Sequence, residues 1–206
     1  AGVAGFKASF WRALYTGISL GILFFSTNRL RSKSILLRGG KPMLISGLLW
    51  GCSGIGFTLG VMTAGASTTL VIISLAPLFA AAFSFIAYRQ RPSWVTLLAA
   101  IGALGGIWFM YREGIGHLSP SGIIFAVSTP LLLGSNLAYM RRHREMSRVA
   151  VCMIGGFAGA AIAFVASGAS VMVPSSSMLP LALLGLVAIP FAQTMISTGT
   201  RYIPAA

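Results

Sequence analysis

Residues 66–92, ASTTLVIISLAPLFAAAFSFIAYRQRP, decide the fold of this chain. Residues 67–88 carry no charge, and the stretch ends abruptly in basic residues at Arg89 and Arg91. An α-helix needs about 20 apolar residues to cross the hydrocarbon of a bilayer. Pro77 lies in the middle and removes one backbone donor. Because such a break at membrane depth needs neighbouring helices or a polar cavity to satisfy the freed carbonyl, we predict a broken or bent spanning helix packed inside a bundle.

The composition of the whole chain agrees with a membrane protein. Hydrophobic residues make up 56% of the 206 residues, charged residues make up only 8%, and the mean hydropathy is +0.88. Soluble domains are about 25% charged. A net charge of +13 would suit a nucleic-acid partner, but the Lys and Arg residues form short clusters between apolar runs, as in the loops of polytopic membrane proteins. We therefore expect the lipid bilayer, and no nucleic acid, as a partner.

The apolar runs predict an all-α, polytopic bundle of seven transmembrane helices. Residues 1–8 lack the order of a signal peptide, and we expect a loop there. Arg12, one turn inside the first span, is expected to reach the membrane interface with its long side chain. The predicted spans are residues 9–26, 42–63, 67–88, 93–111, 122–140, 149–167 and 178–198.

Four pairs of glycines lie four residues apart and therefore on one face of their helices. In lipid this spacing lets helix backbones approach closely, because packing drives association there. We expect ordinary helix contacts at these pairs, with a moving gate or hinge at one of them as the alternative. The pairs are Gly47/Gly51, Gly56/Gly60, Gly102/Gly106 and Gly155/Gly159.

The distribution of basic residues predicts the orientation in the membrane. The connectors at residues 27–41, 89–92 and 141–148 hold eleven Lys and Arg residues, whereas the opposite side holds three. Cytoplasmic loops carry such an excess. We therefore expect a multi-pass protein of the cell membrane with these connectors in the cytoplasm and residue 1 outside. Such a start, with neither signal peptide nor initiator Met, leads us to expect further sequence upstream.

Several motifs follow one another in a characteristic order. They are FWRALYTG at residues 10–17, LAPLF at residues 75–79 with a basic, proline-containing stop after it, and VTLLAAIGALGGIWFM at residues 95–110. Together they resemble the second, fourth and fifth helices of the EamA family of the drug/metabolite transporter superfamily. That family usually carries Glu in a Gly-Glu-Arg cluster at the end of its fourth helix. This chain has Gln90 there, which removes the acid that would form a salt bridge or gate.

The resemblance implies a transporter of ten helices in two inverted five-helix repeats. On this plan, residues 1–112 are the rest of the first EamA-like repeat and residues 113–206 are an incomplete second one, without the first and the last two helices. A constant offset relates three identities, which is consistent with an inverted repeat. The identities are Leu44/Leu183, Gly60/Gly199 and Ala66/Ala205.

The function that the resemblance implies is transport of small metabolites, namely amino acids or related compounds, usually outward and by alternating access. The alternative is a non-transporting truncated remnant or a membrane assembly partner. A small-molecule solute is then the expected partner besides lipid, and a homodimer is left open.

Polar groups, prolines and a tryptophan inside the spans are the candidates for a substrate path. Polar groups are costly in hydrocarbon and tend to face the bundle interior. Ser and Thr can instead bond to the carbonyl four residues back, whereas Asn136 and Gln193 cannot satisfy themselves as completely. A tryptophan can stack on a ligand or pack, and a proline can shape its helix or free carbonyls for substrate. The candidates are Trp50, Ser53, Thr58, Ser74, Pro77, Ser135, Asn136, Pro190, Gln193 and Thr194.

The scarcity of acids argues against an enzyme. Glu113 and Glu145 are the only carboxylates, and both lie in predicted loops. No pair of carboxylates is available for general acid–base catalysis, and no Ser-His-Asp or Cys-His set lies at membrane depth. His117 and His143 stand apart from residues at metal-ligand spacing. We therefore expect no catalysis, no metal and no cofactor, and no carboxylate proton relay within these spans.

Overall fold

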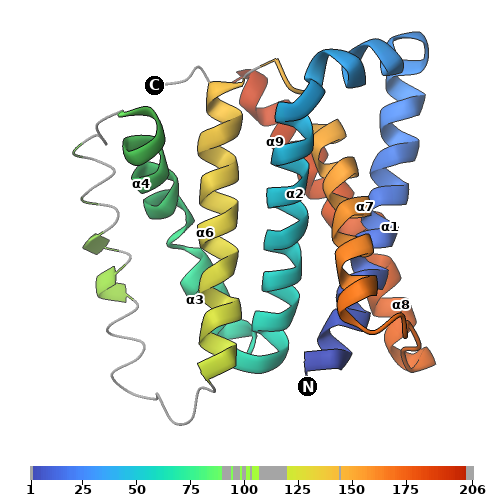
Figure 1. Cartoon of the computed structure of the whole chain (residues 1–206), viewed down its shortest axis with the longest axis vertical. Helices are drawn as coiled ribbons and strands as arrows, with labels where there is room; N and C mark the ends of the chain where they lie inside the picture. The colour runs from blue at the N-terminus through green and yellow to red at the C-terminus, as the bar shows by residue number, and fades with distance from the viewer. Residues whose placement is uncertain are drawn as a thin grey trace. The chain divides into compact units, whose positions relative to one another are not determined.

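The computed structural model is all-α (Figure 1). It describes residues 2–89, 120–143 and 145–202, with positions 94, 98, 101, 102 and 104–106 between them. The predicted span at residues 93–111 falls almost wholly outside the described residues. Six helical segments of the described chain are long and apolar enough to cross a membrane, so the chain is a polytopic helical membrane protein. They are residues 4–28, 32–64, 66–88, 120–142, 148–166 and 175–195.

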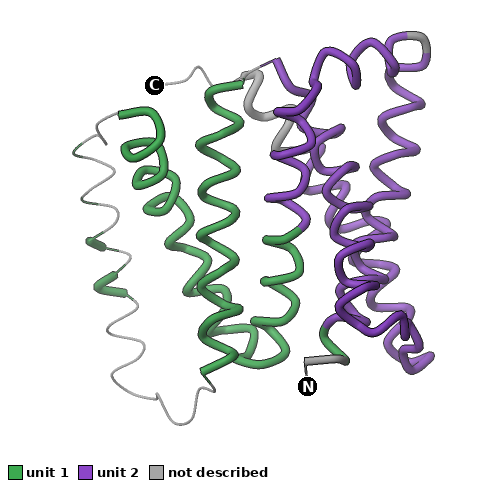
Figure 2. Tube along the Cα trace, in the orientation of Figure 1, with its two compact units in different colours: residues 1–5, 52–144 green, residues 6–51, 145–206 purple. Residues whose placement is uncertain are grey.

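Two compact units make up the chain (Figure 2). Unit 1 comprises residues 1–5 and 52–144, and unit 2 comprises residues 6–51 and 145–206. Each unit thus draws on both halves of the sequence. The division into repeats at residues 1–112 and 113–206 stays a prediction.

Unit 1 is built along helix α6 (Pro120–Arg142), which helices α3 (Ala66–Ile73) and α4 (Ala76–Tyr88) both contact (Figure 1). The second part of helix α2 (Ser32–Ala64) also reaches α6, because a Cβ on Gly60 would lie 3.1 Å from the Cα of Ala126. This close approach is easiest for glycine, because a Cβ here would require α6 to give way by a few tenths of an ångström.

Pro77 breaks the third span, as predicted. Helix α3 ends at Ile73, and the N–H groups of Ser74 and Leu75 bond three residues back, at 3.2 Å and 3.1 Å. Helix α4 then begins with Pro77 in its first turn. A proline is tolerated there because an N–H in the first helical turn has no intrahelical partner.

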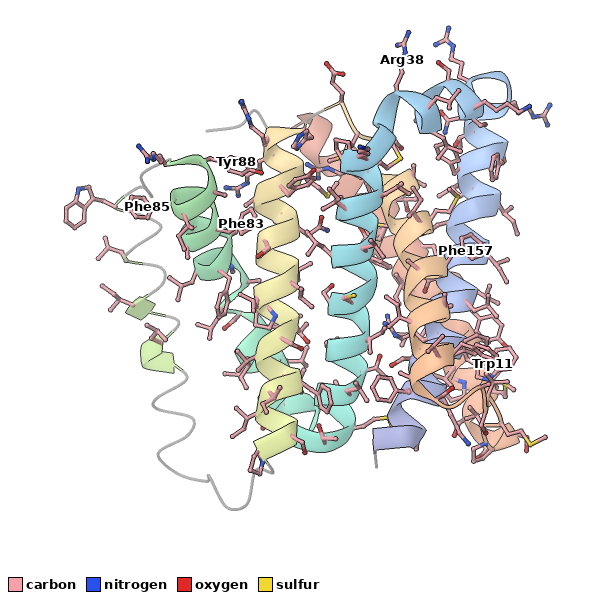
Figure 3. All side chains as sticks on the ribbon, in the orientation of Figure 1. Trp11, Arg38, Phe83, Phe85, Tyr88 and Phe157 are labelled. Carbon is pink, nitrogen blue, oxygen red and sulfur yellow. The ribbon has the colours of Figure 1, made fainter. Side chains whose placement is uncertain are left out.

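In the described part of the chain this broken helix packs against α6 and α2. Its place inside a bundle stays a prediction, because the predicted span at residues 93–111 lies almost wholly outside the described residues. Helix α4 contacts α6, and helix α3 contacts both α6 and α2, where Thr69 lies against Gly60. Phe85 is 53% exposed and points away from α6 (Figure 3). Apolar side chains can face outward here because lipid tails are as apolar as the side chains themselves. The buried residues of the two helices are Thr69, Ile72, Ala76 and Ala80.

Unit 2 contains helix α1 (Gly2–Asn28) from Phe6 onward, α7 (Arg148–Ala166) and a segment in three parts. The three parts are α8 (Ser175–Leu183), the π-helix η2 (Leu184–Ala188) and α9 (Ile189–Tyr202). The unit also includes the first part of α2 (Ser32–Ala64), as far as Gly51.

Glycines bring the helices of unit 2 together backbone to backbone. A Cβ on Gly51 would lie 2.5 Å from the carbonyl oxygen of Gly155, and a Cβ on Gly156 would lie 2.6 Å from the Cα of Gly17. The predicted pairs Gly47/Gly51 and Gly155/Gly159 therefore face each other across the contact of α2 with α7. Helix packing is thus what these two pairs provide here.

Two predicted loops are helical. Residues 2–8 continue α1, so the loop expected at residues 1–8 is wrong, and Gly5 packs against Leu59. The connector at residues 27–41 forms a 3-10 helix, η1 (Arg29–Arg31), and the first turns of α2. Ala, Leu, Lys and Arg have high helix propensity. A helix therefore forms at residues 27–41 despite the high charge density, and at residues 2–8 without a long apolar run.

A kink at Gly40 separates the first turns of α2 from its membrane-spanning part. Gly40 has φ 47° and ψ −145°, a conformation that glycine adopts without the steric cost that a side chain adds. Arg38 lies before this kink, where its side chain is exposed (Figure 3).

Candidate functional site

In the described part of the chain, each unit contains one spanning helix that departs from regular α-helix near a proline, and we take these two regions as candidate sites. In unit 2 the interruption is the π-helix η2. The N–H of Ile189 bonds to the carbonyl of Leu184 five residues back, and the buried Pro190 follows directly. Single π-turns within helices often mark functional sites.

Helix α1 supplies the missing hydrogen bond at this interruption. Pro190 has no N–H to donate to the carbonyl of Leu186 four residues back. The hydroxyl of Ser19 on α1 donates to that carbonyl oxygen at 2.9 Å. The sequence made the carbonyls near Pro190 candidates for substrate binding. The carbonyl oxygen of Leu186 already accepts a hydrogen bond from Ser19 of the same chain.

Gly185 places the π-helix directly on the backbone of α1. A Cβ on Gly185 would lie 2.7 Å from the Cβ of Tyr15 and 2.8 Å from the carbonyl oxygen of Arg12. Gly185 is the central residue of the candidate span 175–195. The backbone of Arg12 therefore lies level with the middle of that span.

The face of α1 around this contact is polar and buried. Ser9, Arg12 and Thr16 follow at intervals of three and four, which puts them on one helix face. They are 0%, 7% and 0% exposed. The Thr16 hydroxyl donates to the Arg12 carbonyl at 2.8 Å, whereas the buried Ser9 hydroxyl has no hydrogen-bond partner among the described residues.

The burial of Arg12 corrects the prediction that this side chain reaches the membrane interface. The prediction assumed that the helix begins near Ser9, whereas α1 begins at Gly2. Arg12 is therefore about three turns inside the helix rather than one. The residue is 7% exposed, and its carbonyl oxygen lies against Gly185.

Aromatic residues of α1 tie the connector between α7 and α8 to this region. The indole Nε1–H of Trp11, labelled in Figure 3, donates to the carbonyl of Val171 at 2.8 Å. The Tyr15 hydroxyl lies 3.9 Å from the sulfur of Met178. These contacts hold the connector before α8, and the first turn of α8 at Met178, against α1.

In unit 1 the interruption at Pro77 faces α6. A Cβ on Gly134 would lie 2.5 Å from the carbonyl oxygen of Ala76 and 2.7 Å from the nitrogen of Ala80. Helix α6 thus lies directly on the first turn of α4, beside Pro77. The structure therefore brings the Pro77 break close to the α6 segment that carries two other predicted candidates, Ser135 and Asn136.

The amide of Asn136 is the most deeply buried of the predicted polar candidates, at 1% exposure. Ser135 is 9% and Ser53 on α2 is 5% exposed. Polar side chains buried within spanning helices face the bundle interior. These three residues share unit 1 with the Pro77 break, but Pro77 itself is exposed.

The hydroxyl candidates outside this group bond within their own helices. Thr58 donates to the Gly54 carbonyl at 3.1 Å, Ser74 to Val71 at 2.6 Å and Thr194 to Phe191 at 2.8 Å. Such bonds satisfy a hydroxyl within its own helix, so these three hydroxyls do not need a substrate to explain their place in a span. Gln193 is half-buried on α9.

Trp50 packs against α7. A Cβ on Gly155 would lie 2.8 Å from Cε3 of the Trp50 ring, so the ring covers the glycine face of α7. Of the two interpretations of Trp50, this contact favours bundle packing over stacking on a ligand.

Sequence reasoning missed the polar face of α1. Ser9, Thr16 and Ser19 were not among the candidates, and Arg12 was placed at the interface. The signal was present in the spacing, because Ser9, Arg12, Thr16 and Ser19 follow at intervals of three, four and three along α1. The π-helix at Gly185 had no comparable signal.

The side chains of the described residues form no group of three or more His, Cys, Asp or Glu that could hold a metal ion. What the two candidate sites offer instead are a buried guanidinium, hydroxyls, an amide and backbone groups at helix interruptions. Such groups bind and orient a ligand by hydrogen bonds and charge.

Comparison with known proteins agrees with this description. The sequence pattern of the EamA-like transporter family matches residues 2–112, more than half of the chain. No curated protein and no solved structure matches the chain. With its polytopic all-α fold and this match, the chain belongs to the EamA-like transporter family, whose members are membrane transporters of small solutes.

Proposed function

We propose that this protein moves a small metabolite across the cell membrane by alternating access, and that amino acids or related compounds leave the cell by this route. Transport of small solutes follows from the family. The narrower substrate class and the outward direction rest on the resemblance of the motifs at residues 10–17, 75–79 and 95–110 to amino-acid and metabolite carriers.

The observation that carries the mechanism is the presence of an interrupted spanning helix in each unit. One helix is broken at Ser74 and Leu75, before Pro77, and the other is continuous but contains the π-helix before Pro190. Transporters form their substrate sites near the bilayer midplane from discontinuous helices. Here each break abuts a neighbouring helix through a glycine, Gly134 in unit 1 and Gly185 in unit 2.

The membrane arrangement of the proposal has the basic connectors in the cytoplasm. Residues 27–41, 89–92 and 141–148 would lie inside, and the connector at residues 167–174 would lie outside. The bias of Lys and Arg supports this orientation. The plan of two inverted repeats, with a boundary near residue 112, belongs to the same proposal.

The test is flux. The protein encoded by the complete reading frame is reconstituted in liposomes, and export of a labelled amino-acid panel is compared with export from empty liposomes. The proposal expects faster loss of at least one label from the protein-containing vesicles. Export equal to that from empty liposomes across the whole panel would favour a non-transporting remnant or an assembly partner.

A further inference from the structure

A positive charge is buried beside the π-helix in unit 2. Arg12 is 7% exposed, and its carbonyl lies against Gly185 at the middle of the candidate span 175–195. Arg29, the first residue of η1 just after α1, is exposed, as is usual for a cation at the membrane surface. A charged side chain at membrane depth is costly, and where it persists it typically marks a substrate or ion pathway.

A second observation points to a ligand at the same place. The Ser9 hydroxyl is fully buried and has no hydrogen-bond partner among the described residues. Buried polar groups nearly always find a partner in the chain, in water or in a ligand. Ser9 lies three residues before Arg12 on the same face of α1, and long helical side chains tend to lean toward the N-terminus, so the two side chains are placed to act on one ligand.

The chemistry of the two groups selects the class of ligand. A guanidinium presents parallel N–H donors that match the two oxygens of a carboxylate, and a hydroxyl can donate one more bond to the same group. The surrounding charge has the same preference, because Glu145, exposed in the connector before α7, is the one acid in the sequence of unit 2.

We propose that Arg12 and Ser9 bind the carboxylate of the transported solute. This inference rests on the transport function proposed above and narrows it to solutes that carry a carboxylate. Arg12 holds the anionic oxygens, and Ser9 donates its otherwise unused hydroxyl hydrogen to one of them. The neutral amide of the same solute lacks the charge and one acceptor oxygen, so it binds less well.

Equilibrium binding tests the site without requiring transport. The purified protein in neutral detergent is heated with propionate or with propionamide, and with leucine or with leucinamide, at matched concentration and ionic strength. The unfolding temperature should rise with the carboxylate of each pair and much less with the amide, because a ligand that binds the folded state stabilises it. Equal shifts for acid and amide would overturn the inference, and this comparison needs no variant.

Variants then assign the effect to the two residues. Arg12→Gln should weaken carboxylate binding roughly tenfold or more, since a charge-assisted bond is lost, and Arg12→Lys should weaken it less because the charge is kept. Arg29→Gln is the matched control and should bind as the wild type does. Ser9→Ala should also weaken binding of the carboxylate, and wild-type affinity in Ser9→Ala would show that this hydroxyl serves a buried water only. Wild-type affinity in Arg12→Gln would overturn the site as a whole.

Two further experiments ask whether the bound anion is a solute or a lipid, and whether a failure concerns the anion site or the proposed transport. If added phosphatidylglycerol abolishes the propionate effect, the site takes a lipid phosphate and the inference is wrong. The acid-over-amide preference must persist in the presence of that lipid. Wild-type liposomes that export no amino acid, while the preference remains in the binding assay, would contradict transport but not the anion site. Export of acid and amide at equal rates would contradict the site alone.

Discussion

The hydroxyl of Ser19 lies 2.9 Å from the carbonyl oxygen of Leu186 and donates a hydrogen bond to it. Leu186 lies four residues before Pro190, which has no N–H to offer that carbonyl. In the membrane no water replaces a missing donor. Helix α1 therefore supports the interrupted helix of unit 2 through one side chain, and this relationship can be tested.

We expect Ser19→Ala to destabilise the protein by about 1 kcal/mol, the usual net value of one such hydrogen bond. The unfolding temperature of the purified protein in detergent measures the loss. In a Pro190→Ala background residue 190 offers a backbone N–H near the same carbonyl, so Ser19→Ala should cost less there. An equal loss in both backgrounds would show that the Ser19 bond does not compensate for the proline.

Gly51→Ala tests the contact of α2 with α7. The new Cβ would meet the Gly155 carbonyl oxygen at 2.5 Å, so the helices must separate, and overpacking of this kind costs about 1–3 kcal/mol. Gly21→Ala is the matched control, because its Cβ would lie 3.7 Å from the sulfur of Met153, an ordinary contact. Thermal unfolding should show a clear loss for Gly51→Ala and little change for Gly21→Ala. The reverse order would contradict the packing described here.

Pro77→Ala tests whether the break in the third span serves transport. Alanine restores an N–H, so α3 and α4 can join into one continuous helix. We expect a folded protein whose amino-acid export falls several-fold, because the interrupted backbone is part of the proposed path. Pro120→Ala, at the start of α6, is the control and should export normally. Export at the wild-type rate by Pro77→Ala would remove this break from the mechanism.

Cysteine labelling tests the orientation. Cys52 and Cys152 are first replaced by alanine to give a thiol-free background. Ser170→Cys, in the connector between α7 and α8, should then react in intact cells with a maleimide that cannot cross the membrane. Lys33→Cys, in the first turn of α2 and within the basic connector at residues 27–41, should react only after permeabilisation. Labelling of Lys33→Cys in intact cells would invert the proposed topology.

The membrane fold was predictable because hydrocarbon imposes a long apolar run on every spanning helix. The run at residues 67–88 and its break at Pro77 were both visible in the sequence, and the structure confirms them. The glycines at Gly51 and Gly155 were likewise expected to face a neighbouring helix. Each of these signals is local, since it depends only on residue type and spacing.

Other features depend on contacts between distant segments and were not visible. The helix at residues 2–8 extends a short, Gly- and Ala-rich stretch that gives no boundary signal, and this error placed Arg12 too near the interface. The π-helix at Gly185 coincides with a close backbone contact to Arg12 and Tyr15, which lie far away in the sequence. Ser19 became relevant only once Leu186 was placed beside it.

Entrance counterflow tests the central claim, alternating-access transport, most directly. Liposomes containing the protein are loaded with an unlabelled amino acid and diluted into a trace of the same amino acid in labelled form. An alternating-access carrier exchanges the two, so label should accumulate transiently above its outside concentration and then decline. Label that rises only to the level seen in protein-free liposomes, for every amino acid of the panel, would contradict the claim.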